Sequence, residues 1–303
     1  MKLAYKVNKD CPYLYINDVL NHEFKLSSRL LSKLIKLKKI YLNGNTCDTR
    51  EKIKNGDIII CDFDYPEDNS NIVSAKNNAK NLNIIYEDDG LLIVSKPSNL
   101  AVHPSMMHYD DTLSNMVKNY FDNIGLYKKI RPVNRLDLNT SGLVVFAKNE
   151  YLQECLIKQM SNNTFKKYYL AIVEGKLNNL SGTINEPIAR KENSIIERCV
   201  SAQGQNSITH YNVIYSNDNY SIVKCSLETG RTHQIRVHFS FIGHPLLGDT
   251  LYGNHSNLID RQALHCYFLE FVNPLTNKTL KVESPIPDDM KKFFDNKKKE
   301  YLW

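Results

Sequence analysis

From residue 82 onward the chain consists of short apolar runs separated by turn residues, and this pattern restricts the possible folds more than any other feature. The runs are rich in β-branched and aromatic residues and are too short for buried helices, so they predict strands. The first two runs flank Asp89-Gly90, which signals a hairpin because glycine adopts positive φ without steric cost. The predicted strands comprise residues 84–86, 91–94, 142–147, 168–173, 208–214, 220–227 and 267–272.

Two segments between these strands predict helices. Residues 150–160 have a helical pattern, and Thr232 is a suitable N-cap for a second helix that places Ile235 and Phe239 on one face and stops at Gly243. Many strands with few helices favour an α+β fold, in which a mixed, mostly antiparallel sheet carries flanking helices.

The beginning of the chain predicts a smaller α/β unit. Residues 27–39 form an amphipathic helical pattern with a cationic side, and Ser27 or Ser28 is suited to cap it. The turn pairs Asn43-Gly44 and Gly56-Asp57 lie beside short apolar runs, which is typical of a hairpin module.

A polar stretch, residues 66–81, separates the two patterns and has the composition of a linker. We therefore expect two domains, residues 1–75 and residues 76–303.

Basic residues are concentrated near this first helix. The formal net charge of +6 permits a polyanionic partner without requiring one. A solvated surface is the usual explanation for lysines on one helix face, and nucleic-acid contact is the alternative. The basic residues of the segment are Lys25, Arg29, Lys33, Lys36, Lys38, Lys39, Arg50, Lys52 and Lys54.

The seven cysteines are scattered without a CxxC pair, and an odd number cannot all pair within one chain. A reducing, cytoplasmic setting is expected. Residues 1–16 lack the apolar block of a signal peptide, and no run approaches the roughly 18 apolar residues of a membrane span. We expect a soluble monomer without membrane contact.

The segment 131–143 carries the sharpest chemical signal. It reads Arg-Pro-Val-Asn-Arg-Leu-Asp-Leu-Asn-Thr-Ser-Gly-Leu and continues into the predicted strand. Asp137 thus lies in a polar loop at the edge of a core element, where side chains can face a substrate. The alternative is a structural turn in which Asp137 and Thr140 bond to the backbone.

A second signal is the segment 227–238, which reads Leu-Glu-Thr-Gly-Arg-Thr-His-Gln-Ile-Arg-Val-His. Arg231 would lie at the positive end of the predicted helix. From there it could pair with a carboxylate and lower the pKa of that acid. A surface arginine in a solvated turn is the alternative.

Together these segments resemble the RluA-type family of RNA pseudouridine synthases, over about residues 82–290. The sequence departs from the family at Asn134, where the family commonly has His, whereas Asp137 is intact. The matching blocks are Ser95-Lys96-Pro97-Ser98 with Ala101-Val102-His103-Pro104, Asn134-Arg135-Leu136-Asp137 with Thr140-Ser141-Gly142-Leu143, Lys167-Tyr168-Tyr169-Leu170-Ala171 to Gly175, Gly230-Arg231-Thr232-His233-Gln234-Ile235-Arg236, and Gln262-Ala263-Leu264-His265.

The first seventy or so residues separately resemble the S4 RNA-binding module that is often fused in front of such enzymes. This resemblance rests on Leu20, Ser28-Arg29, Asn43-Gly44 and Gly56-Asp57.

The resemblance implies a cofactor-independent enzyme that isomerises uridine to pseudouridine in RNA. Asp137 is the implied catalytic group, Arg231 is our candidate for keeping it ionised, Tyr169 is implied to stack on the uracil, and Leu264 is a candidate for the pocket wall. Contacts to the RNA backbone are expected from Arg135, Arg236 and the basic helix with Arg29, Lys33 and Lys36. Large-subunit ribosomal RNA is the favoured substrate, and transfer RNA is the alternative.

Other classes of function have less support. His233 and His238 are not spaced i, i+4 and no HExxH motif occurs, so no metal is expected. A non-catalytic RNA-binding factor for ribosome assembly would not require the Asp137, Tyr169 and Arg231 set. A hydrolase of small glycosides generally needs a second carboxylate, for which Asp249 is the only nearby acid of the motifs.

Overall fold

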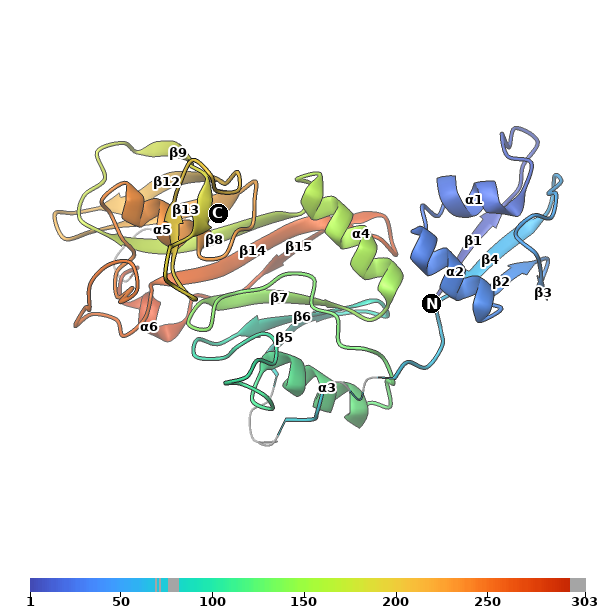
Figure 1. The fold of residues 1–303 in the computed structure, drawn as a ribbon, viewed down its shortest axis with the longest axis horizontal. Helices are drawn as coiled ribbons and strands as arrows, with labels where there is room; N and C mark the ends of the chain where they lie inside the picture. The colour runs from blue at the N-terminus through green and yellow to red at the C-terminus, as the bar shows by residue number, and fades with distance from the viewer. Residues whose placement is uncertain (69, 71, 76–81, 295–303) are drawn as a thin grey trace.

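The computed structural model describes residues 1–68, 70, 72–75 and 82–294. Its first unit is a four-stranded antiparallel sheet in the order β1-β4-β2-β3 with two helices packed on it (Figure 1). Its elements are β1 (Lys2–Lys6), α1 (Ile16–His22), α2 (Ser28–Lys36), β2 (Ile40–Leu42), β3 (Asn45–Thr46) and β4 (Ile58–Asp62).

Local sequence signals account for much of this unit. The Ser27 hydroxyl accepts a hydrogen bond from the backbone N–H of Leu30 and caps α2, as predicted. The helix ends before residue 39, because Lys38 has a φ of 52° and cannot continue it. Asn43 and Gly44 both have positive φ and join β2 to β3 in the predicted tight hairpin.

The large unit is built on a nine-stranded sheet in the order β5-β6-β7-β14-β8-β13-β12-β9, with β15 paired to β14. Among the described residues, the strands of this sheet pair antiparallel except β7 with β14, which are parallel, so the expected mixed, mostly antiparallel sheet is confirmed. The strands are β5 (Ile84–Glu87), β6 (Leu91–Lys96), β7 (Ser141–Ala147), β8 (Lys166–Glu174), β9 (Ser181–Asn185), β12 (Ile208–Ser216), β13 (Tyr220–Leu227), β14 (Leu264–Asn273) and β15 (Lys278–Glu283).

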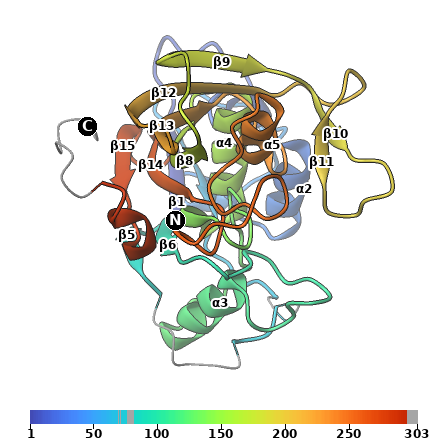
Figure 2. The same ribbon diagram turned by 90° about the vertical axis from the view of Figure 1, so that its left-hand side faces the viewer.

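Helices flank this sheet, and a short two-stranded ribbon extends away from it (Figure 2). The helix α4 was predicted, whereas α3 was not, because its polar residues obscure the apolar stripe formed by Leu113, Val117 and Phe121. The elements are α3 (Leu113–Asn123), α4 (Glu150–Ser161), β10 (Ile188–Arg190), β11 (Arg198–Val200), α5 (Gln234–Phe241) and α6 (Asp288–Lys291).

The two units have separate hydrophobic cores, one centred on Leu20, Leu30 and Ile59, the other on the fully buried strand β7 and its neighbours. The division at residue 75 stays a prediction, since residues 76–81 lie outside the described part. The sequence also has a basic run at residues 291–299, of which residues 295–299 lie outside the described part. None of the described helices has the length and apolarity required to cross a membrane.

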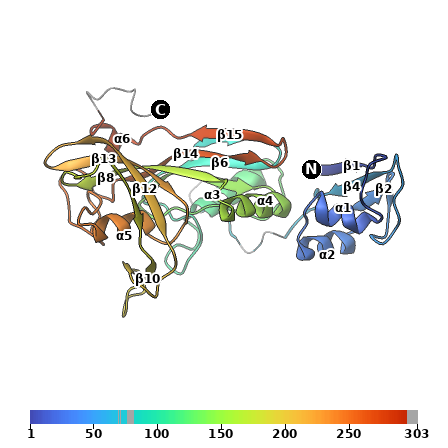
Figure 3. The ribbon, with the colours of Figure 1, turned by 90° about the horizontal axis from the view of Figure 1, so that it is seen from above.

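The first unit packs against the beginning of α4 (Figures 1 and 3). Lys33 Nζ lies 2.7 Å from a Glu150 oxygen and 3.1 Å from a Glu67 oxygen. The Glu67 side chain is only 5% exposed and forms two hydrogen bonds of 2.6 Å with Arg131. The predicted linker 66–81 therefore begins with a buried ionic contact.

Candidate active site

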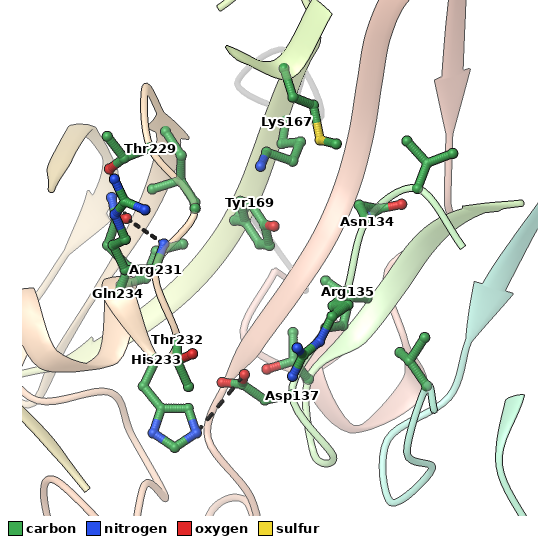
Figure 4. A pocket seen from close by; sticks show the side chains of 18 of the residues that line it. Asn134, Arg135, Asp137, Lys167, Tyr169, Thr229, Arg231, Thr232, His233 and Gln234 are labelled. Atoms are coloured by element: carbon green, nitrogen blue, oxygen red, sulfur yellow. Dashed lines mark hydrogen bonds and ion pairs between the residues drawn. The ribbon is translucent and has the colours of Figure 1, made fainter. Parts of the chain in front are cut away.

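The two segments that carry the chemical signals of the sequence, the Asp137 loop and the Arg231 segment, line one cavity of about 1080 Å³. The cavity lies between the loop before β7, the end of α4, strand β8 and the turn before α5 (Figure 4). Its walls come from within residues 101–105, 133–140, 157–169 and 227–236, together with Leu264.

Backbone contacts position the Asp137 loop. Gly142 has a φ of 120°, and a Cβ there would lie 2.2 Å from the Cys266 carbonyl oxygen, so only glycine allows β7 to approach β14 this closely. Asn134 donates a hydrogen bond to the Leu143 carbonyl and accepts one from the Val145 N–H. Asn134 thus fastens the loop to β7 and also lines the cavity (Figure 4).

Asp137 meets two basic side chains of the α5 region. Its side chain is 24% exposed, with one oxygen 3.3 Å from Arg236 Nη1 and the other 3.9 Å from His233 Nε2. Burial lowers the pKa of His233, an effect that Asp137 opposes. Arg236 is therefore the permanent cation beside the carboxylate.

The cation expected beside Asp137 was Arg231, and here the structure differs from the prediction. Arg231 lines the same cavity but is exposed, and its Nε donates to the Asn206 carbonyl at 3.2 Å. Arg236 was expected to contact RNA phosphates, yet it is 6% exposed. Its Nε and Nη2 bind the two oxygens of Asp249 at 2.6 and 2.8 Å. Asp249, fully buried in this pair, is not a free second carboxylate.

The start of α5 explains this difference. Thr232 was predicted as the N-cap, but the N-cap is His233, which has a φ of 58° and makes no side-chain capping bond. The helix therefore begins at Gln234, whose side-chain oxygen accepts the Arg231 N–H at 2.9 Å. Arg231 lies in the preceding turn, while Arg236 lies in the first helical turn, which packs toward Asp137.

Lys96 is a further basic residue in contact with the Asp137 loop, through the carbonyl of Leu138. It is 1% exposed, and its ammonium donates to the carbonyls of Pro97, Leu100 and Leu138 at 2.7 to 2.9 Å. Burial lowers the pKa of Lys96 to about 7, against the opposing attraction of Asp137. The sequence contained Lys96 in a matching block, but nothing in its neighbourhood indicated this burial.

Tyr169 and Leu264 both line the cavity, at 6% and 4% exposure. Burial raises the pKa of Tyr169 well above its ordinary value, so the phenol stays protonated. Arg135 is exposed in the cavity lining. Lys167, which was not singled out, extends from β8 into the same space (Figure 4).

The basic residues of α2 are not among the side chains that line this cavity. Arg29 is 3.8 Å from Glu150 and otherwise exposed, and Lys33 is held by Glu67 and Glu150. These ion pairs occupy Lys33, so its predicted contact with RNA competes with its contact to α4. Lys36 is exposed.

Comparison with known proteins decides the family. Residues 90–241 match the family described as RNA pseudouridylate synthase. The chain belongs to the RNA pseudouridine synthase family. The resemblance found in the motifs is thereby confirmed, and the chain is a pseudouridine synthase of the RluA type.

Relatives of this synthase cover most of its length. An uncharacterized RNA pseudouridine synthase YhcT of Bacillus subtilis (strain 168) is 39% identical over 95% of both chains. The ribosomal large subunit pseudouridine synthase D of Nitrosomonas europaea is 41% identical over 69% of this chain and 63% of its own. The solved structure of human RNA pseudouridylate synthase domain containing 1 is 27% identical, with a TM-score of 0.56 over 69% of this chain and 85% of that one.

Within the described residues of the synthase, no group of three or more His, Cys, Asp or Glu side chains is arranged to hold a metal ion. The S4-like character of the first unit stays a prediction.

Proposed function

We infer that this synthase isomerises specific uridines of large-subunit ribosomal RNA, with Asp137 as the catalytic carboxylate. The observation that carries this proposal is the position of Asp137. Its carboxylate faces a cavity large enough for a nucleotide and lies 3.3 Å from the buried guanidinium of Arg236.

The reaction requires an anionic group at the sugar. The N1–C1′ bond breaks, the base turns, and C5 bonds to C1′ without net oxidation. A carboxylate can capture or stabilise the electron-poor C1′, or remove the 2′ proton. Arg236 supports either role, because a neighbouring cation favours the ionised acid. Asp249 in turn orients Arg236 through its two hydrogen bonds.

The target base must leave its helix or loop to reach this carboxylate, at an unstacking cost of about a few kcal/mol. Tyr169 offers an aromatic surface beside the carboxylate, and Leu264 offers an apolar one. We propose that the extruded uracil lies against these two side chains while the exposed Arg135 contacts the RNA backbone.

Ribosomal RNA is the proposed substrate because several relatives, at 32 to 41% identity, are named ribosomal large subunit pseudouridine synthase D. The basic first unit supports a large RNA partner, and transfer RNA is the alternative substrate.

Two measurements test this proposal. Asp137→Asn should reduce pseudouridine formation at least about 1000-fold while RNA binding stays within about threefold. Near-normal turnover by this variant would reject the catalytic role. Chemical mapping of pseudouridine in total RNA, with and without the protein, should show the loss of specific sites in large-subunit ribosomal RNA. Loss confined to transfer RNA would reject the proposed substrate.

A further inference from the structure

Lys167 is a cation in the cavity that the roles assigned above leave unused. It lies two residues before Tyr169 on β8, so both side chains leave the same face of the strand, roughly 6.6 Å apart. Both line the cavity, and Figure 4 shows Lys167, Tyr169 and Asp137 in that order along it.

The ammonium of Lys167 is available to a ligand. Within the described part of the chain, no hydrogen bond or ion pair is found for its Nζ. The backbone of Gly230 passes close by, because a Cβ at that position would lie 3.2 Å from Nζ. Burial lowers the pKa of Lys167, as expected for an ammonium held away from bulk water.

Its depth distinguishes Lys167 from the two exposed arginines of the cavity, and Arg236, the third arginine, is already paired with Asp249 and Asp137. Arg135 and Arg231 are exposed, as suits contacts to phosphates, which stay outside a base-binding pocket. Lys167 is half-buried beside the aromatic ring. A uracil on Tyr169 with its sugar at Asp137 would direct a carbonyl oxygen toward Lys167, because the two-residue repeat of the strand, roughly 6.6 Å, spans about one pyrimidine ring.

We propose that the Lys167 ammonium donates a hydrogen bond to a carbonyl oxygen of the flipped uracil and balances the negative charge of the base while it is detached from the sugar. This rests on the proposed function of the cavity. When N1–C1′ breaks, the electron pair of that bond stays on N1 and delocalises onto O2 and O4. C5 then donates a pair to C1′ and loses its proton, and N1 gains one.

The same donor can bind the base both before and after the base turns. Turning the base to present C5 in place of N1 exchanges the positions of O2 and O4. A cation that binds one carbonyl before the turn therefore binds the other afterwards. Such a donor acts most strongly on the detached anion, so it accelerates bond cleavage more than it tightens binding.

The test compares Lys167→Met with Lys166→Met, whose side chain leaves the opposite face of β8 and does not line the cavity. We expect Lys167→Met to lower the single-turnover rate on saturating RNA about 100-fold, with the Kd for RNA within threefold. Lys166→Met should match the wild-type rate. Thermal unfolding of both variants verifies that they are folded.

A second variant separates charge from packing. Lys167→Ala should regain at least about tenfold of the lost rate with ethylammonium chloride, but none with tetramethylammonium chloride at equal ionic strength. An unchanged rate for Lys167→Met, a loss confined to Kd as for a phosphate contact, or no rescue by ethylammonium would overturn the proposal. Failure of the proposed function is distinguishable, since Asp137→Asn would then retain activity.

Discussion

Glu67 anchors the contact between the two units, and its replacement should destabilise that contact measurably. We call Lys33, Glu67, Arg131 and Glu150 the docking cluster. Burial by itself raises the pKa of Glu67, but hydrogen bonds and charge from Arg131, followed by Lys33, outweigh it and hold the pKa at about 2 instead of 4.5. The ionised carboxylate is thus strongly favoured in the folded protein.

The size of the effect follows from that pKa. A decrease from 4.5 to about 2, at roughly 1.36 kcal/mol for each pKa unit, corresponds to about 3 kcal/mol. Because the folded-state pKa is depressed, this stability is fully present above pH 4.5 and is lost as the pH falls toward 2. Glu67→Gln resembles the protonated acid and should cost about 3 kcal/mol of unfolding free energy at pH 7.

Urea unfolding followed by circular dichroism at pH 7 and pH 3 measures this difference. Glu270→Gln is the matched control, because Glu270 forms a 3.9 Å surface pair with Lys281 and is 36% exposed. Glu67→Gln should lower the free energy of unfolding strongly at pH 7 and clearly less at pH 3. Glu270→Gln should lower it only slightly at either pH. Equal losses of unfolding free energy for the two variants, or a loss for Glu67→Gln that is as large at pH 3 as at pH 7, would contradict this prediction.

Two further predictions concern the active site and the RNA contact. Arg236→Met leaves Asp249 buried without its partner and should cost about 3 to 5 kcal/mol of unfolding free energy and most of the activity. Adding Asp249→Asn should restore a large part of the stability, and strictly additive losses in the double variant would contradict this coupling. If the first unit binds RNA through its exposed lysines, the double variant Lys36→Gln, Lys38→Gln should bind RNA with a weaker salt dependence. The plot of the logarithm of the association constant against the logarithm of the salt concentration should be less steep by about two. An unchanged slope in binding titrations would exclude these two contacts.

Local chemistry allowed parts of the fold to be predicted from the sequence. The Asn43-Gly44 hairpin needs positive φ at both residues, and few other pairs supply it. Strand β7 was recognised because both of its faces are buried, which requires an unbroken apolar run. These signals depend on neighbours along the chain.

Contacts between distant residues could not be predicted in the same way. The sequence offers no reason to prefer Arg236 over Arg231 as the partner of Asp137. Arg236 takes this position because α5 begins at Gln234, after His233 in a left-handed conformation. Lys33 looked like a solvated or RNA-binding lysine because its partner Glu150 lies far along the sequence. A periodic pattern identifies a helix face but not the surface that covers it.

The docking cluster and the active site share one segment, which bears on how the two units cooperate. Arg131 begins the stretch that ends at Asp137, and this stretch is bonded to β7 by Val133 N to the Val145 carbonyl at 2.7 Å and by Ala147 N to the Arg131 carbonyl at 2.9 Å. Because β7 is buried along its whole length, a loosened first unit has no low-energy way to move Asp137. Glu67→Gln should therefore weaken RNA binding but leave the single-turnover rate on saturating RNA at the wild-type level. A reduced rate would show that docking also positions the carboxylate.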